Sequence, residues 1–440
     1  MQWRGAAAAL VLAAAGCGGH VQPAPSLAGD ASQMFGPAME PRAKSQIKYI
    51  VIIVQENRTP DNLFQGLKGA DIKSSGLNTK GKVVQLQPVP LEVDYDMNHT
   101  HDSFVSEWQN GNMDGFNLDG HKGHCPNTST CAYAYVPQSE TQPYLDLASQ
   151  YAFADRMFAS NQGPSFPAHQ YIVSGASTTD STGKYKAADN PYGKHGPNGG
   201  GCDASKDVRV DTIDAQGQVG NPVYPCFDRQ TLGDLLDQKA ITWRYYQQGK
   251  GIGLWHAFDA IHHIRYGSDY ANVITPPSVV LNDIGSGRLR QVSWVTPDGS
   301  DSDHSGQRSK GGPAWVSSIV NAIGGSQYWN QCAIFVTWDD WGGWYDHVPP
   351  PIYNSYELGM RVPLIAISPY AKKNYISETP YEFGSLLKFV EQTFGLGSLN
   401  STDARANSVS DMFNFNQRPR AFVHIKAPRL VIDRSVPDSD

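Results

Sequence analysis

The chain has 440 residues, a formal net charge of −7 at neutral pH and a pI of about 6.0. It contains no dense basic stretch, so the sequence offers no footprint for nucleic acid. The 43 Gly, 29 Pro, 21 Tyr and 10 Trp are typical of a loop-rich α/β enzyme and argue against a helical bundle or a coiled coil.

The first 19 residues have the pattern of an export signal and are set apart from the fold. Arg4 supplies the positive flank, and the apolar run 6–15 is too short to span a bilayer. The sequence around Cys17 is similar to a bacterial lipoprotein cleavage site, which predicts an N-terminal lipid anchor as the only membrane contact; ordinary secretory cleavage is the alternative. Either way we expect an exported protein, in the cell envelope or secreted, with residues 20–46 as a flexible tether.

The first strand of the fold is predicted at Ile50–Val54, where every residue is β-branched, as in strands that are buried on both faces. Polar residues follow at once, at the strand end where open α/β sheets bind ligands. Glu56 and Asn57 there offer a carboxylate and an amide oxygen to a metal ion. A solvated strand end followed by a helix cap is the alternative interpretation.

A segment rich in His and Asp follows at residues 94–102. His99 and His101 are separated by one residue, so they can project the same way from an extended chain. They are candidates for metal binding, phosphate contact or proton donation, and an exposed polar loop is the alternative.

Ser165 lies between Pro164 and Pro167, after a helical pattern and a short strand in residues 144–158. Proline restricts its own backbone and that of the preceding residue, so we expect a rigid turn that fixes the direction of the hydroxyl. A fixed direction is what a nucleophile needs, although serines between prolines also occur as ordinary turn residues.

Five cysteines remain after Cys17. In an oxidising compartment Cys125 with Cys131, and Cys202 with Cys226, could close short loops, but the sequence leaves the pairing open. Cys332 lies in an apolar run and is expected to be a buried free thiol. The Gly-, Asn- and Asp-rich region 180–226 is predicted to be a surface insertion.

Adjacent carboxylates follow the predicted buried strand Cys332–Trp338. Asp339 and Asp340 repel each other and need a cation, a proton or full solvation. Asp346 and His347 follow in the same loop, which favours a functional interpretation. Another buried strand is predicted at 362–368, and amphipathic helices are predicted at 314–323 and 382–396.

At least four apolar strands end in polar clusters, and helical patterns separate most of them. This alternation predicts one α/β domain over residues 47–440 with a mostly parallel sheet. The sheet would bring candidate residues to one edge: Glu56, Asn57, Ser165, His304, Asp339 and Asp340. Oxygen ligands favour Ca, Mg or Mn and are also compatible with Zn. A metal that touches a serine oxygen lowers its pKa and makes it a nucleophile.

Four segments together resemble the bacterial phosphoesterase family, which contains non-specific phospholipases C and acid phosphatases and belongs to the alkaline phosphatase superfamily. They are residues 55–61, 163–167, 337–351 and 361–370. The resemblance covers 47–415 and implies a three-layer α/β/α sandwich. It implies the following roles: metal binding by Glu56, Asn57, Ser165, Asp339 and Asp340; catalysis by Ser165, His99, His304 and His347; substrate binding by Asn57, His101 and Asp346.

The sequence departs from the family pattern in two ways. Ala168-His169 stands where the family often has Asn-Arg, so phosphate or substrate contacts are expected to differ there. The C-terminal β-domains of the longer phospholipases are absent, which weakens the assignment of a lipid substrate.

We therefore predict a metal-dependent phosphoric ester hydrolase with a phosphoseryl intermediate. Its substrate would be a phosphomonoester, as for an acid phosphatase, or a phospholipid headgroup, as for a phospholipase C. The alternative from another class is an exported, non-catalytic binding protein for a phosphorylated ligand. The sequence does not indicate the oligomeric state.

Overall fold

The computed structural model describes residues 46–194, 199–306 and 309–432. The predicted export signal, Cys17 and almost all of the predicted tether lie outside these ranges. Within them, every helix is too short or too polar to cross a lipid bilayer.

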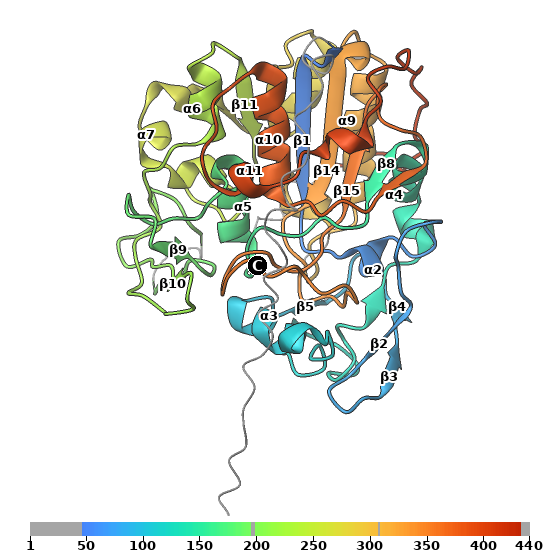
Figure 1. The fold of residues 1–440 in the computed structure, drawn as a ribbon, viewed down its shortest axis with the longest axis vertical. Helices are drawn as coiled ribbons and strands as arrows, with labels where there is room; N and C mark the ends of the chain where they lie inside the picture. The colour runs from blue at the N-terminus through green and yellow to red at the C-terminus, as the bar shows by residue number, and fades with distance from the viewer. Residues whose placement is uncertain (1–45, 195–198, 307–308, 433–440) are drawn as a thin grey trace, which may run out of the picture.

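A sheet of eight strands forms the centre of the molecule, in the order β12-β11-β13-β1-β14-β15-β8-β16 (Figure 1). Neighbouring strands run parallel except at β15, which is antiparallel to both β14 and β8. This confirms the predicted mostly parallel sheet. The strands are β1 (Tyr49–Gln55), β8 (Ala152–Ala154), β11 (Trp243–Tyr246), β12 (Val273–Ile274), β13 (Val292–Val295), β14 (Cys332–Trp338), β15 (Leu364–Ile367) and β16 (Tyr375–Ser377).

Helices cover both faces of the sheet, in two groups whose members contact one another. One group contains α4 (Gln138–Gln150), α8 (Val279–Gly285) and α9 (Gly312–Gly324). The other contains α5 (Ser165–Ser174), α6 (Leu232–Asp237), α10 (Phe383–Phe394) and α11 (Thr402–Arg405). Both predicted amphipathic helices are present, and α10 begins after the cap residue Glu382 and ends at the left-handed Gly395. The three-layer α/β/α architecture is thus confirmed.

A smaller lobe lies beyond the carboxyl ends of β1 and β14 (Figure 1). It contains β2 (Ser75–Leu77), β3 (Val83–Gln85), β4 (Gln87–Pro88), β5 (Tyr95–Met97), α3 (His101–Trp108), β6 (His121–Gly123) and β7 (Ala134–Tyr135). Its apolar core also takes in Trp341 and Trp344 from the loop after β14. The lobe therefore packs directly on the strand ends that carry the predicted site.

The remaining short elements lie mostly in the connections. They are α2 (Pro60–Leu63), β9 (Tyr185–Ala187), β10 (Thr212–Asp214), α7 (His262–Arg265) and the 3₁₀-helices Gln109–Gly111, Ala257–Ala260, Ser268–Asn272, Gly299–Asp301, Trp329–Gln331 and Val409–Met412. Cys125 is bonded to Cys131 and Cys202 to Cys226, which are the pairs that the sequence offered, and Cys332 is a buried free thiol as predicted.

Candidate active site

The candidate site begins where β1 and β14 end side by side. The two strands are parallel, and Gln55 lies opposite Trp338, so the residues that follow them are neighbours. The backbone N–H of Asp339 donates to the Gln55 carbonyl at 3.0 Å, and the N–H of Asn57 donates to Asp339 Oδ1 at 3.0 Å. Glu56 and Asp340 are completely buried beside them. The sheet register thus brings together the two acidic strand ends that the sequence singled out.

A tight turn holds Asn57 in position. Its φ of +62° lies in the left-handed region, which asparagine tolerates better than most residues. The backbone of Gly342 packs against this turn: a Cβ atom at Gly342 would lie 2.5 Å from the Asn57 carbonyl oxygen. Gly342 N–H also donates to Asp340 Oδ1 at 2.7 Å, a hydrogen bond within the loop that follows β14.

Ser165 is the first residue of α5 and is fully buried. Its Oγ lies 3.3 Å from Glu56 Oε2, 3.3 Å from Asp340 Oδ2 and 3.5 Å from Asn57 Oδ1. A hydroxyl has one hydrogen to donate, so it cannot satisfy three oxygen neighbours at once. This crowding of oxygen atoms is what a cation would relieve.

The segment around Ser165 is helical, where the sequence analysis expected a rigid turn. Pro164 is the cap residue, and Pro167 falls in the first helical turn, where no intrahelical N–H donor is required. Ser165 therefore points from the N-terminal end of a ten-residue helix, where the backbone dipoles favour negative charge on the ligand or on the hydroxyl oxygen.

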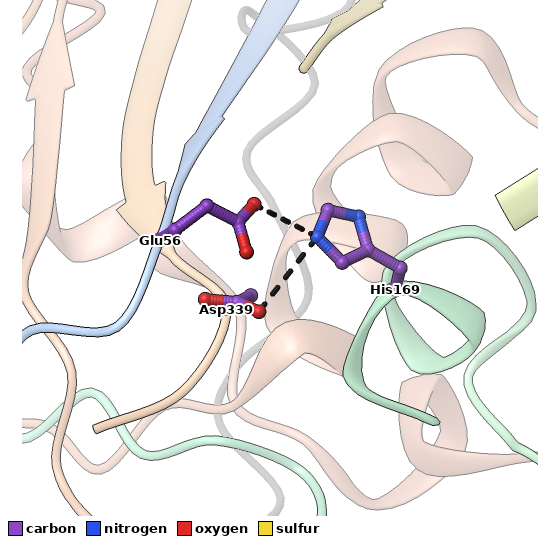
Figure 2. A group of neighbouring side chains, drawn as sticks. All are labelled: Glu56, His169 and Asp339. Atoms are coloured by element: carbon purple, nitrogen blue, oxygen red, sulfur yellow. Dashed lines mark hydrogen bonds and ion pairs between the residues drawn. The ribbon is translucent and has the colours of Figure 1, made fainter. Parts of the chain in front are cut away.

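His169 is a site residue that the sequence analysis noted only as a departure from the family pattern. It lies four residues after Ser165, and in a helix this spacing places both side chains on one face. Its Nε2 lies 3.0 Å from Glu56 Oε1 and 3.7 Å from Asp339 Oδ2 (Figure 2). The spacing of four residues between Ser165 and His169 is visible in the sequence. It places two side chains on one face only in a helix, and a turn was predicted there.

Two further imidazoles meet at the Asn57 side chain. Asn57 Nδ2 lies 3.1 Å from His99 Nε2 and 3.2 Å from His304 Nε2. The Nδ1 atom of each ring donates to a backbone carbonyl, of Met97 at 2.7 Å and of Ser305 at 2.6 Å. These bonds fix both rings with Nε2 facing the amide. His99 and His304 are thus joined to the Ser165 cluster through Asn57, and their catalytic roles stay predictions.

The residues present fit a divalent metal ion. Glu56, Asp339 and Asp340 are buried carboxylates, and Asp339 Oδ2 accepts no hydrogen bond from the residues that the structure describes. Buried carboxylates that share a site need a cation or a proton. Ligand atoms of Glu56, His169 and Asp339 all lie within 4.8 Å of one another, which is close enough for one ion. As a ligand, the imidazole would add a nitrogen to the predicted all-oxygen set and would shift the preference from Ca towards Mn or Zn.

Asp346 and His347 make their hydrogen bonds in a cluster separate from Ser165, and their catalytic and substrate-binding roles stay predictions. Arg361 binds Asp346 through two hydrogen bonds, at 2.9 and 3.0 Å. His347 Nδ1 donates to Asp61 at 2.8 Å, and its Nε2 donates to Asp71 at 3.0 Å. Both ring nitrogens are therefore engaged by carboxylates, and Arg361 offsets part of the negative charge of this second acidic cluster.

His101 lies near the site, but its ring is hydrogen-bonded outside the Ser165 cluster. It is the first residue of α3, and its Nδ1 donates to the carbonyl of Gln162 at 2.9 Å, three residues before Ser165. Burial lowers its pKa below the ordinary value. With Trp108 and Ile352 it lines a largely apolar hollow of about 470 Å³.

The second cluster makes a testable contribution to stability. Burial alone would lower the pKa of His347, but the hydrogen bond and charge of Asp61 raise it above the ordinary value. The folded state thus binds this proton more tightly than the unfolded chain. The stability gain is fully present below the ordinary pKa of about 6.5 and is lost as the pH rises through the folded-state pKa.

We therefore expect His347→Gln to lower the free energy of unfolding by about 1–3 kcal/mol below pH ~6, and by less at higher pH. Denaturant unfolding of both proteins across this range measures the difference. His124→Gln, at an exposed histidine, is the control and should have no such effect. A deficit that does not change with pH would contradict the assigned charge on His347.

A family model that matches most of the chain identifies its family. A model of the Phosphoesterase family matches residues 47–397. The chain belongs to the phosphoesterase family. Non-hemolytic phospholipase C of Burkholderia pseudomallei is 24% identical to this family member, over 79% of this chain and 55% of the relative. Hemolytic phospholipase C of Pseudomonas aeruginosa is 23% identical, over 92% of this chain and 60% of the relative.

Two other matches extend the comparison. Non-specific phospholipase C1 of Arabidopsis thaliana is 24% identical to this phosphoesterase family member, over 88% of its chain and 75% of the relative. A solved structure from Vibrio parahaemolyticus, described as a protein in the alkaline phosphatase superfamily, is similar with a TM-score of 0.42 and 11% identity, over 85% of this chain and 72% of that one. The family member spans only 55–60% of the two bacterial phospholipases.

Proposed function

We propose that this phosphoesterase family member is a metal-dependent phosphoric ester hydrolase that works through a phosphoseryl intermediate on Ser165. One observation carries the proposal: the Ser165 hydroxyl lies within 3.5 Å of side-chain oxygens from Glu56, Asn57 and Asp340, all buried. A nucleophile held among carboxylates at a helix N-terminus suits attack on phosphorus, where positioning and charge neutralisation dominate catalysis.

Each group has a role in this scheme. Ser165 Oγ attacks phosphorus and the substrate alcohol leaves, after which water cleaves the Ser–O–P ester and restores the hydroxyl. Asn57 and the N-terminal end of α5 would bind phosphoryl oxygens. His99 and His304 would contact the phosphoryl group or protonate the departing alkoxide. A bound divalent cation would lower the pKa of the serine hydroxyl and neutralise the phosphoryl oxygens.

The ligands of that cation are proposed to be Glu56, His169, Asp339 and Asp340, with Asn57 and Ser165 beside them. His169 is the addition to the set that the sequence predicted. Because its Nε2 is 3.0 Å from Glu56 Oε1, it serves either as a metal ligand or as the group that orients Glu56.

The substrate is proposed to be a phosphoric ester, and one feature favours a diester with an apolar arm as a second candidate. His101, which lines the largely apolar hollow, is two residues from His99 in the chain. The hollow has room for an apolar group. The curated relatives named phospholipase C agree with such a substrate. We also propose export of the protein; the two disulfides support an oxidising compartment.

Metal analysis tests the proposal. We expect the purified protein to contain a divalent metal in stoichiometric amount. Chelation should abolish turnover of a chromogenic phosphate ester, and added metal should restore it. A panel of monoesters, phosphatidylcholine and sulfate esters then separates the substrate classes. Stoichiometric metal without hydrolysis of any ester would instead support the binding-protein alternative.

A further inference from the structure

Asp303 is a buried carboxylate that the proposed hydrolysis does not use, and it comes immediately before His304. Its φ of +73° lies in the left-handed region, which is uncommon for a residue with a side chain. Two hydrogen bonds hold this backbone in place. The N–H of Asp303 donates to Ser309 Oγ at 2.7 Å, and its carbonyl accepts from Arg58 Nε at 2.8 Å. The turn that presents His304 is therefore fixed at the residue before it.

The Asp303 carboxylate also contacts the residue before each of the two acidic strand ends. Its Oδ2 accepts from Trp338 Nε1 at 3.1 Å and from Gln55 Nε2 at 3.4 Å. Trp338 ends β14 and precedes Asp339. Gln55 ends β1 and precedes Glu56. Because β1 and β14 run side by side (Figure 1), one carboxylate oxygen bridges both strands at the edge that carries the site.

Two neighbouring helices, α4 and α9, hold the same carboxylate. Tyr144 of α4 donates its hydroxyl to Asp303 Oδ2 at 2.7 Å, and its ring packs edge-on against Trp338. Gly312, the first residue of α9, lies so close that a Cβ atom there would be 1.9 Å from Asp303 Oδ1. The N-terminal end of a helix favours a negative charge nearby. The carboxylate is therefore confined in position and in orientation.

Arg58 supplies the opposite charge. Burial raises the pKa of Asp303 to about 6, against the lowering effect of the Arg58 charge, so the carboxylate is ionised at neutral pH. Buried charge networks of this kind often serve only to specify the fold. This network differs in where its contacts lead. Gln55, Trp338 and Asp303 are each followed directly by a residue of the candidate site.

We propose that Asp303 is a positioning residue of the candidate active site. It would set the separation of the two acidic strand ends and the direction of the His304 ring, without touching the substrate. His304 Nε2 lies 3.2 Å from Asn57 Nδ2, so a shift of the preceding turn would break this contact. Misplacing a site group by about 1 Å can slow a reaction about 10²-fold. The kinetic part of this inference rests on the proposed hydrolase function, and the geometric part does not.

Substitution of Asp303 tests the kinetic part. Asp303→Ala should lower kcat for a chromogenic phosphate ester by about 100-fold or more, at saturating metal and in protein that circular dichroism shows to be folded. Asp303→Asn keeps an oxygen that accepts from Tyr144 and Trp338, so it should retain kcat within about tenfold of the wild type. A carboxylate with only a structural role would lower the melting temperature of both variants and leave kcat per folded molecule unchanged. That result would overturn the proposal.

Tyr144→Phe covers the case in which Asp303→Ala does not fold. It keeps the ring, removes the hydroxyl that donates to Asp303, and should lower kcat about five- to tenfold. Tyr246→Phe is the matched control, because it removes a buried 2.8 Å hydrogen bond to the Asp283 carboxylate in α8, outside the site. The control should lose similar stability and keep wild-type kcat. Equal kcat in these two variants would count against Asp303 as a positioning residue.

Crystal structures of the wild type and of Asp303→Ala, or of Tyr144→Phe in its place, separate this inference from the hydrolase function. If the wild type hydrolyses no ester, the proposed function fails, and the positioning role is judged on the structures alone. We expect His304 Nε2 to move away from Asn57 Nδ2 by about 1 Å or more in the variant. An unmoved His304 ring together with an unchanged spacing of Glu56 and Asp339 would contradict the inference.

Discussion

Ser165→Ala protein is expected to fold normally and to hydrolyse a chromogenic phosphate ester at least about 10⁴-fold more slowly than the wild type. Among the described residues, the Ser165 hydroxyl is the group that lies between Glu56, Asn57 and Asp340 and can form a phosphoryl ester. Removing one oxygen atom from a fully buried site leaves the packing of α5 almost unchanged, so the loss would be chemical. Steady-state kinetics together with the melting temperature make this distinction.

Ser318→Ala is the matched control for this substitution. Ser318 lies in α9, where its hydroxyl donates to the Ala314 carbonyl in the same helix, and it is not part of the site. The control protein should keep wild-type turnover. If Ser165→Ala also retained turnover within about tenfold, Ser165 would not be the nucleophile, whatever the metal content of the protein.

Asp340→Asn is expected to lower both the bound metal and turnover, the latter by about 10³-fold or more. The substitution conserves shape but removes one of the negative charges that would hold the cation. Asp340 Oδ2 is also 3.3 Å from the Ser165 oxygen, so the same change would leave the nucleophile less activated. Metal content per protein and kcat, measured on the same preparation, report both effects.

His347→Gln provides the contrast between the two acidic clusters. His347 is joined to Asp61 and Asp71, and the Ser165 cluster lies elsewhere in the structure. We therefore expect this variant to lose stability but to keep its metal and its turnover. A loss of turnover as large as that of Ser165→Ala, in folded protein, would support the catalytic role of His347 that the family resemblance implied.

For the Asp340→Asn substitution, retention of the bound metal would remove the Asp340 carboxylate from the proposed ligand set.

The parts of the site that could be predicted from the sequence are those fixed by strand patterns. The β-branched run Ile50–Val54 and the apolar run Cys332–Trp338 predicted two buried strands of one sheet. Their parallel pairing is enough to bring Glu56 next to Asp339. The structure forms the two disulfides that the sequence offered, although the sequence left the pairing open. In each case local chemistry and the overall fold point the same way.

The parts that could not be predicted depend on backbone geometry between elements. Gly342 and Gly343 both adopt left-handed conformations, with φ of +60° and +68°, in the loop that links Asp340 to Asp346. The two carboxylates therefore end in separate clusters, although they are only six positions apart. Arg361, which pairs with Asp346, lies in the segment before β15, so periodicity does not connect them.

His169 was missed for a different reason. Two nearby prolines favoured a turn at Ser165, and a helix that begins at that serine uses the same prolines at positions where they are tolerated. The i, i+4 relation of Ser165 and His169 carries information only once the helix is known. The proposed metal preference changes with it, because the proposed set of oxygen ligands gains an imidazole nitrogen.

The central claim is that Ser165 becomes covalently phosphorylated beside a metal held by the two strand ends. The most direct measurement is mass spectrometry of metal-loaded protein that has been mixed with a phosphate ester and quenched in acid during turnover. We predict one added phosphoryl group on the peptide that contains Ser165, and none in metal-free protein. Turnover with that peptide unmodified, or with the phosphoryl group on another residue, would contradict the account.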